Sequence, residues 1–122
     1  MVETFYSEGI QVLLHHDSNW TPMLDFLKDL PKGSAILELD GDTDIFKAKE
    51  VLGDHMCLMG DVPAYLFTLG TTEEIEAYVK RLINEVGKGS GFILSSGCEI
   101  PADAKRENIQ TVIDTAKNYY PH

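Results

Sequence analysis

The chain has 122 residues, with 20 acidic and 10 basic side chains and a formal net charge of −10. This balance argues against nucleic acid and anionic membrane surfaces as partners, because both are bound through basic patches. The sequence contains no apolar run of membrane-spanning length, no secretory signal and no disulfide framework, since it has only two cysteines. We therefore expect a single domain over residues 1–122 in the reducing cytoplasm.

Four strand–helix units follow one another along the chain. The predicted strands are short apolar runs at residues 10–14, 35–39, 56–59 and 91–94. Amphipathic segments follow them at residues 21–30, 43–52, 71–86 and 106–119. Thr21 and Asp42 are the expected N-caps of the first two helices, and Thr71 with Glu74 predicts a capping box at the third. The tail at residues 119–122 is expected to be a surface end.

Nearly apolar strands that alternate with amphipathic helices predict a parallel sheet covered by helices, in the α/β class. Two architectures fit this order: a small doubly wound sheet, or four units of a (β/α)8 barrel, whose usual length is about 250 residues. A phosphate-binding glycine loop would favour the first. The glycine-rich segment Gly87–Gly91 precedes a strand instead of following one, so it is a plain connection and the barrel segment is favoured.

Ionisable side chains follow the strands, where parallel α/β folds place their chemistry. Strand alternation puts Glu38 and Asp40 on the face opposite to Leu37 and Leu39, toward the inside of a barrel. We expect three carboxylates to line one mouth: Glu38, Asp40 and Asp61. Asp40 and Asp61 are candidates to orient the ring of His15 by a hydrogen bond.

His15, Asp17 and Cys98 are candidate metal ligands. Zinc accepts imidazole, carboxylate and thiolate, and a catalytic zinc site has three protein ligands and one open position. His15 and Asp17 share one strand face, whereas only the fold can bring Cys98 to them. The alternative is a simple His–Asp hydrogen bond beside an unrelated cysteine. Trp20 could be a pocket wall, or it could pack against the start of the first helix.

Several segments resemble the uroporphyrinogen-decarboxylase superfamily over essentially the whole chain. Residues 91–101, GFILSSGCEIP, followed by Glu107 and Asn108, are similar to the final strand and helix of its cobamide-dependent methyltransferase branch. Residues 52–62 and 70–74 resemble an earlier strand and a helix start, and residues 14–19 resemble the strand that carries a His-x-Cys or His-x-Asp pair. The resemblance implies that this chain is the C-terminal half of a (β/α)8 barrel, with its last four βα units.

The resemblance also implies zinc. His15 matches the family's histidine and Cys98 its late cysteine, while Asp17 stands where the methyltransferases have a cysteine. A carboxylate ligand makes the metal harder and better suited to an oxygen than to a thiol. The implied reaction is O-demethylation, in which a methyl group passes from a methoxylated, possibly aromatic, compound to the corrinoid of a partner protein.

The remaining polar groups receive predicted roles in the same reaction. Glu38 and Asp61 are the predicted catalytic carboxylates, and the predicted substrate-binding residues are Asn19, Trp20 and Asp40. Two alternatives stay open. One is a decarboxylase of porphyrinogens, which needs no metal and binds carboxylates through arginines; the other is an inactive half-barrel that only assembles. Because four units cannot close a barrel, a homo-oligomer is expected.

Overall fold

The computed structural model describes residues 1–121, so the last residue of the expected surface tail, His122, lies outside the described part. Four parallel strands form one sheet in chain order: β1 (Val12–His16), β2 (Ala35–Leu39), β3 (Cys57–Val62) and β4 (Phe92–Ser96). The predicted α/β class with a parallel sheet is confirmed. None of the described helices is long and apolar enough to cross a membrane.

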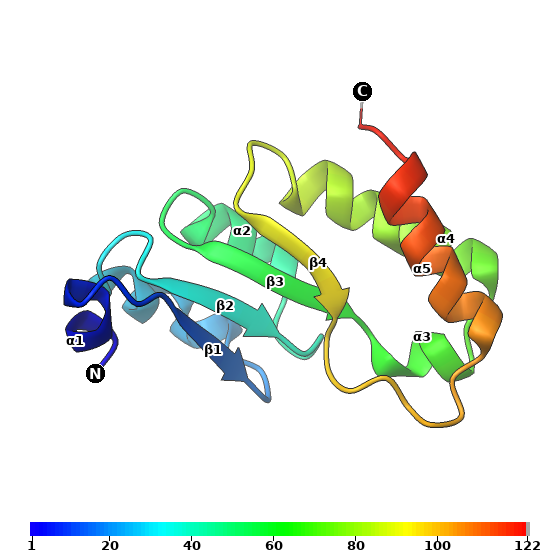
Figure 1. Ribbon diagram of the computed structural model, residues 1–122, viewed down its shortest axis with the longest axis horizontal. Helices are drawn as coiled ribbons and strands as arrows, with labels where there is room; N and C mark the ends of the chain where they lie inside the picture. Colours follow the sequence, from blue (N-terminus) through cyan, green and yellow to red (C-terminus); the bar gives the residue numbers. More distant parts are fainter. Residues whose placement is uncertain (122) are drawn as a thin grey trace.

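Helical segments connect the strands and cover one side of the sheet (Figure 1). They are α1 (Val2–Ser7), the 3-10 helix η1 (Thr21–Asp29), α2 (Ile45–Leu52), α3 (Ala64–Thr68), α4 (Thr72–Arg81), its π-helical continuation η2 (Leu82–Val86) and α5 (Arg106–Asn118). In Figure 1, α2 lies behind the sheet, and α4 and α5 lie side by side beyond β4. The helices therefore leave the front face of the sheet uncovered.

The core lies between the sheet and these helices. Leu37 and Leu39 of β2, with Leu58 and Val62 of β3, are fully buried. They meet apolar side chains of the helical layer: Leu24, Ile45, Ala48, Leu52, Ile75, Val79, Leu82 and Val86. Removing apolar surface from water stabilises the fold by about 25 cal/mol per Å2, so this one layer supplies most of the hydrophobic stabilisation.

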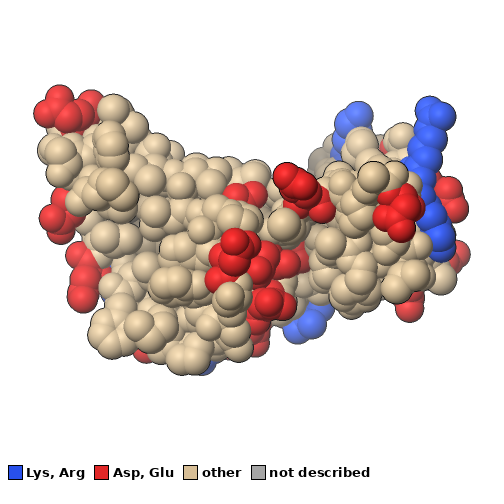
Figure 2. Space-filling view, turned by 90° about the horizontal axis from the view of Figure 1, so that it is seen from below, with Lys and Arg blue, Asp and Glu red and all other residues tan. Residues whose placement is uncertain are grey.

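The opposite face of the sheet is open. Leu13 of β1 is 48% exposed and Ile93 of β4 is 41% exposed, although both are large apolar residues within strands. Figure 2 shows the molecule hollowed along one side, between two raised ends. In a closed barrel this face would be interior, and here it is a surface. We call it the open face.

The starts of the helices agree only in part with the N-caps predicted from the sequence. Thr71 caps α4 and exchanges hydrogen bonds with Glu74, so the predicted capping box is confirmed. The predicted cap of the second helix is wrong by two residues: Asp44, not Asp42, accepts hydrogen bonds from the first backbone amides of α2. Thr21 is also not an N-cap, because η1 begins at Thr21 itself and its hydroxyl accepts from the amide of Asp44.

Candidate functional site

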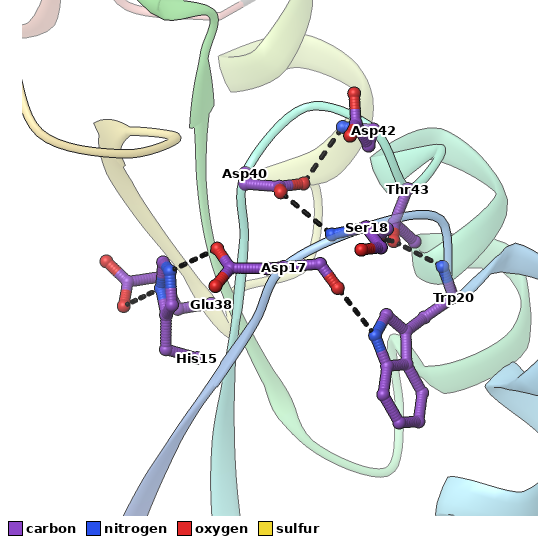
Figure 3. Close-up of polar contacts among 8 residues, drawn as sticks. All are labelled: His15, Asp17, Ser18, Trp20, Glu38, Asp40, Asp42 and Thr43. Atoms are coloured by element: carbon purple, nitrogen blue, oxygen red, sulfur yellow. Dashed lines mark hydrogen bonds and ion pairs between the residues drawn. The ribbon is translucent and has the colours of Figure 1, made fainter.

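His15 is the centre of a small polar group on the open face (Figure 3). Strand β1 extends to His16, one residue beyond His15, and the parallel register places His15 directly beside Glu38 of β2. The imidazole Nδ1 is 2.9 Å from Oε2 of Glu38, and Nε2 is 3.0 Å from Oδ1 of Asp17. The structure therefore brings together one predicted ligand pair, His15 and Asp17, with one predicted catalytic carboxylate.

The two carboxylates change the protonation of the histidine. The hydrogen bond with Glu38 is the main cause that raises the pKa of His15, partial desolvation opposes it, and the bond with Asp17 adds to it. A neutral imidazole has one N–H, so only the imidazolium can donate to both carboxylates at once. The metal-free site therefore favours a protonated His15, and a metal at Nε2 would have to displace that proton.

Asp40 lies at the same end of the sheet but does not contact His15. One carboxylate oxygen accepts from the backbone amide of Ser18, 3.1 Å away, and the other accepts from the amide of Asp42, 3.0 Å away (Figure 3). Asp40 thus connects the chain after β1 with the turn after β2. The predicted orientation of His15 by Asp40 or Asp61 is not what the structure shows, because Glu38 makes that contact through the strand register.

The two other predicted substrate-binding residues form the turn that leads into η1. Asn19 accepts from the amide of Thr21, 2.9 Å away, in a local turn. Trp20 stacks on His16 with ring centroids 4.2 Å apart, and its indole N–H donates to the backbone carbonyl of Asp17 at 2.8 Å. These contacts join Trp20 to the end of β1, and its two predicted roles, in a pocket wall or in packing at the start of the helix, stay predictions.

Cys98 is exposed and follows β4, the strand at the other edge of the sheet from β1. Adjacent strands lie about 4.8 Å apart, so β1 and β4 are separated by roughly 14 Å along the sheet. The chain after β4 shortens this path. The amide of Gly97 donates to Val62, and a Cβ on Gly97 would lie 2.5 Å from the carbonyl oxygen of Asp40. Only glycine fits there, and the contact places Cys98 beside the end of β2.

Within residues 1–121, no three His, Cys, Asp or Glu side chains are arranged to hold a metal. The predicted set of His15, Asp17 and Cys98 is thus assembled in part: the first two are in contact, and Cys98 is near the same end of the sheet without a contact to either. The metal-ligand roles of these residues stay a prediction.

Asp61 is not in the expected mouth. It is only 2% exposed, and its Oδ1 accepts from the hydroxyl of Tyr78 in α4, 2.7 Å away, on the helix side of the sheet. The sequence indicates the mouth for Asp61 only because this residue follows the third predicted strand. In the structure β3 continues to Val62, and Gly60, which precedes Asp61, has a φ of +133°. Burial raises the pKa of Asp61 to about 6, although the bond from Tyr78 lowers it. The predicted placement of Asp61 in the mouth is therefore wrong, and its catalytic role stays a prediction.

One residue of the site was not predicted from the sequence. Thr43 was assigned to the start of the second helix, but it lies in the turn before α2, where its fully buried hydroxyl bonds the chain on both sides of Asn19. A threonine in a polar turn has no sequence pattern that separates this role from capping. The nearest signal is the Asp-Gly-Asp-Thr turn directly after β2.

Parallel βα units with imidazole and carboxylate groups at one end of the strands are the arrangement of a (β/α)8 enzyme. The family model "Uroporphyrinogen decarboxylase (URO-D)" matches residues 1–119. The chain therefore belongs to the uroporphyrinogen decarboxylase family, as its resemblance implied.

Three relatives show how much of a family member this chain represents. It is 30% identical over 90 residues to a uroporphyrinogen decarboxylase of Methylococcus capsulatus. The matched region is 73% of this chain and 25% of that protein. With the Neisseria meningitidis enzyme the identity is 34% over 84 residues, 68% of the chain and 23% of that protein. A methyltransferase from Methanosarcina mazei superposes with a TM-score of 0.73 at 24% identity, over 95% of this chain and 34% of that one.

The chain spans about a quarter of the length of these curated relatives and about a third of the methyltransferase. The structural match confirms the fold as a segment of a (β/α)8 barrel, with four parallel βα units and an open face where the other units of such a barrel would stand. At this level of identity, the match concerns the fold alone.

Proposed function

We propose that this chain is the zinc-binding segment of a methyltransferase that moves a methyl group from a methoxylated, possibly aromatic, compound to the corrinoid of a partner protein. The observation that carries the proposal is the contact of His15 with Glu38 on one side and Asp17 on the other. The named methyltransferase of the same fold supports this branch of the family. So does the Gly97–Cys98 turn after β4, which resembles the methyltransferases.

The His15 group fits a zinc ion. A ligating histidine usually donates its other ring N–H to a carboxylate, and Glu38 is placed to accept from Nδ1. That leaves Nε2 for the metal. Two tetrahedral ligands about 2.0–2.1 Å from zinc lie about 3.3 Å apart. Nε2 of His15 and Oδ1 of Asp17 are 3.0 Å apart, so a small separation of the two would accommodate an ion between them.

Cys98 is the proposed third ligand. It is exposed, so its side chain can turn without disturbing the core, and Gly97 already holds this segment against Asp40. When bound, zinc would supply Lewis acidity to the ether oxygen of the methyl donor. The chain's own residues would do the rest: Glu38 would hold the proton on Nδ1 and fix the ring, and Asp40 would fix the loop that carries Asp17.

Zinc affinity of the whole 122-residue chain tests the ligand set. We expect His15→Ala to abolish stoichiometric binding and Cys98→Ala to weaken it, as measured by competition with a chromophoric chelator. Cys57→Ala is the matched control, because Cys57 is the other free thiol and is the first residue of β3, at the opposite end of the strand from the site. If Cys98→Ala and Cys57→Ala behave alike, Cys98 is not a ligand. If the unaltered chain binds no zinc, the proposal fails.

The decarboxylase alternative is favoured by the names of the curated relatives. The two arginines of this chain lie away from the strand ends: Arg81 is on α4, stacked over Phe46 and paired with Glu85, and Arg106 begins α5. An assay in the presence of a chelator separates the two functions. Release of CO2 from a porphyrinogen under that condition would favour the decarboxylase, and a chelator-sensitive transfer of methyl to a corrinoid protein would favour the methyltransferase.

The open face suggests how the chain is completed. Leu13 and Ile93 are exposed on it, and covering them would remove apolar surface from water. We propose a second copy as the cover, related by a twofold axis, which would also enclose His15. Sedimentation of the purified chain tests this proposal. A dimer that Leu13→Asp dissociates would support it, and a monomer at all concentrations would refute it.

A further inference from the structure

The segment between β1 and η1, residues 17–20, has no regular secondary structure, yet it carries Asp17 to the imidazole of His15. Ser18 in this loop has a φ of +74°, a conformation that non-glycine residues rarely adopt. Such a backbone persists only when surrounding contacts hold it. The question is therefore which side chains define the shape of the loop.

Thr43, in the turn before α2, bonds the loop at two points. Its Oγ1 accepts from the amide of Trp20 at 2.8 Å and donates to the carbonyl of Ser18 at 3.0 Å. The residue is fully buried, so these backbone groups have no water to replace it. A hydroxyl is suited to this position because it donates and accepts from one atom. Valine has the same shape and could do neither.

Two further contacts complete the clamp. The indole N–H of Trp20 donates to the carbonyl of Asp17 at 2.8 Å, and Asp40 accepts from the amide of Ser18 at 3.1 Å. The loop is thus held at Asp17, Ser18 and Trp20, and Thr43 bonds the residues on both sides of Asn19. Figure 3 shows Thr43 and Asp40 approaching the loop from the chain after β2.

We propose that Thr43 is a positioning residue, which sets the backbone of the loop so that Asp17 faces Nε2 of His15. Its functional consequence rests on the proposed metal binding by His15 and Asp17. Because the clamp fixes the backbone of the loop, the fold sets the distance between Asp17 and His15. Loss of the hydroxyl would release the amide of Trp20 and the carbonyl of Ser18, and Asp17 would then sample positions away from the histidine.

Zinc affinity of three variants tests the proposal. Thr43→Val should weaken binding by about ten- to hundredfold, the usual effect of removing a group that orients a ligand. Thr43→Ser, which retains the hydroxyl, should bind as the unaltered chain does. Thr71→Val is the control, because it makes the same substitution at a hydroxyl that also accepts from a backbone amide, at the exposed N-cap of α4. If Thr43→Val weakens binding no more than Thr71→Val, the effect is general destabilisation and the proposal fails.

A second measurement does not depend on zinc. The sequence has one tryptophan, so the indole N–H of Trp20 gives a single assignable NMR signal. Thr43→Val should accelerate hydrogen exchange of this N–H, while Thr43→Ser and Thr71→Val leave it unchanged. Unchanged exchange in Thr43→Val would overturn the proposal. If the unaltered chain binds no zinc but Thr43→Val still accelerates the exchange, the metal proposal fails and the positioning of the loop by Thr43 is upheld.

Should Thr43→Val fail to fold, Trp20→Phe replaces it in the zinc measurement. Phenylalanine retains a ring to stack on His16 and removes only the indole donor to Asp17. We expect weaker zinc binding with an unchanged unfolding transition. Unchanged affinity would show that the clamp around Asp17 does not set the metal site, and the proposal would fail.

Discussion

Leu13 and Leu37 are leucines of adjacent strands in the same sheet, and their surroundings are opposite. Leu37 is fully buried under the helices, whereas Leu13 is 48% exposed on the open face. His15 and Glu38 lie on the same open face as Leu13. Leu39 lies with Leu37 on the face that the helices cover. One side of each strand therefore supplies stability, while the alternate residues present chemistry. Substitutions on the two faces should separate these roles.

The largest contrast should come from truncating the two leucines. Leu37→Ala should reduce the free energy of unfolding by about 2–5 kcal/mol, because it leaves a cavity in a closed core. At a concentration where the chain is monomeric, Leu13→Ala should change it by no more than about 0.5 kcal/mol, as exposed substitutions do. Urea unfolding followed by circular dichroism measures both values. Equal losses would mean that the open face is covered in solution, which would itself support the proposed dimer.

The second contrast concerns the buried carboxyl on the helix side. The pKa of Asp61 in the fold is about 6, above its ordinary value of 3.8, so the folded state binds this proton more tightly. The stabilisation is complete below about pH 4 and is lost as the pH rises through the folded-state value, a change on the order of 3 kcal/mol. Asp61→Asn should remove this decline from a series of urea titrations between pH 4 and 7.

Two controls define the contribution of Asp61. Asp25→Asn, at an exposed carboxylate of η1 paired with Lys28, should leave the pH profile unchanged. Tyr78→Phe removes the hydrogen bond that lowers the pKa of Asp61, so the decline should move to higher pH. An Asp61→Asn profile that is parallel to that of the unaltered chain would show that Asp61 is not the group that titrates.

A smaller effect is expected on the open face. Glu38→Gln keeps the shape of the side chain but removes the charge that stabilises the imidazolium, so the pKa of His15 should fall. Zinc affinity should also fall, by about ten- to hundredfold, because the partner that orients the ligand is weakened. NMR titration of the imidazole in zinc-free protein measures the pKa of His15, and competition with a chelator measures the zinc affinity. Glu85→Gln, at the exposed partner of Arg81, should change neither.

The smallest effect should come from the capping box. Thr71→Ala removes the side-chain acceptor for the amide of Glu74, which should cost about 1 kcal/mol of unfolding free energy. Zinc affinity and the indole signal should not change, because α4 covers the face opposite to His15. A shift in either would show that the two faces are coupled.

The sequence predicted the parts of the fold that depend on local pattern. The bounds of β2 and the cap at Thr71 are as predicted, because an apolar run between turns and a capping box are both short-range signals. Strand β1 was expected to stop before His15, since two histidines look like the end of a strand. It continues because parallel pairing with Glu38 and Leu39 of β2 supplies hydrogen bonds regardless of side chain.

The site was predictable where strand alternation holds. It placed Glu38 with His15 on one face, and the register then made the contact. Asp61 was expected at the mouth only because it follows a predicted strand. Its side chain lies on the helix side instead, directly after Gly60 with its positive φ, and the sequence does not reveal the φ of a glycine. It also gave no sign of Thr43, whose partners are backbone groups of a loop from another unit.

The outer strands of the sheet have a consequence for handling the protein. In the described sheet, β1 and β4 each pair on one side only, so each presents a row of free backbone N–H and C=O groups. The apolar run Phe92-Ile93-Leu94 lies on such an edge, and strands of this composition recruit other strands and form aggregates. A lysine in place of Ile93 should reduce this aggregation and keep the purified chain in solution for the zinc and unfolding experiments. The sedimentation test needs the unaltered Ile93, because this residue is part of the face that the proposed dimer covers.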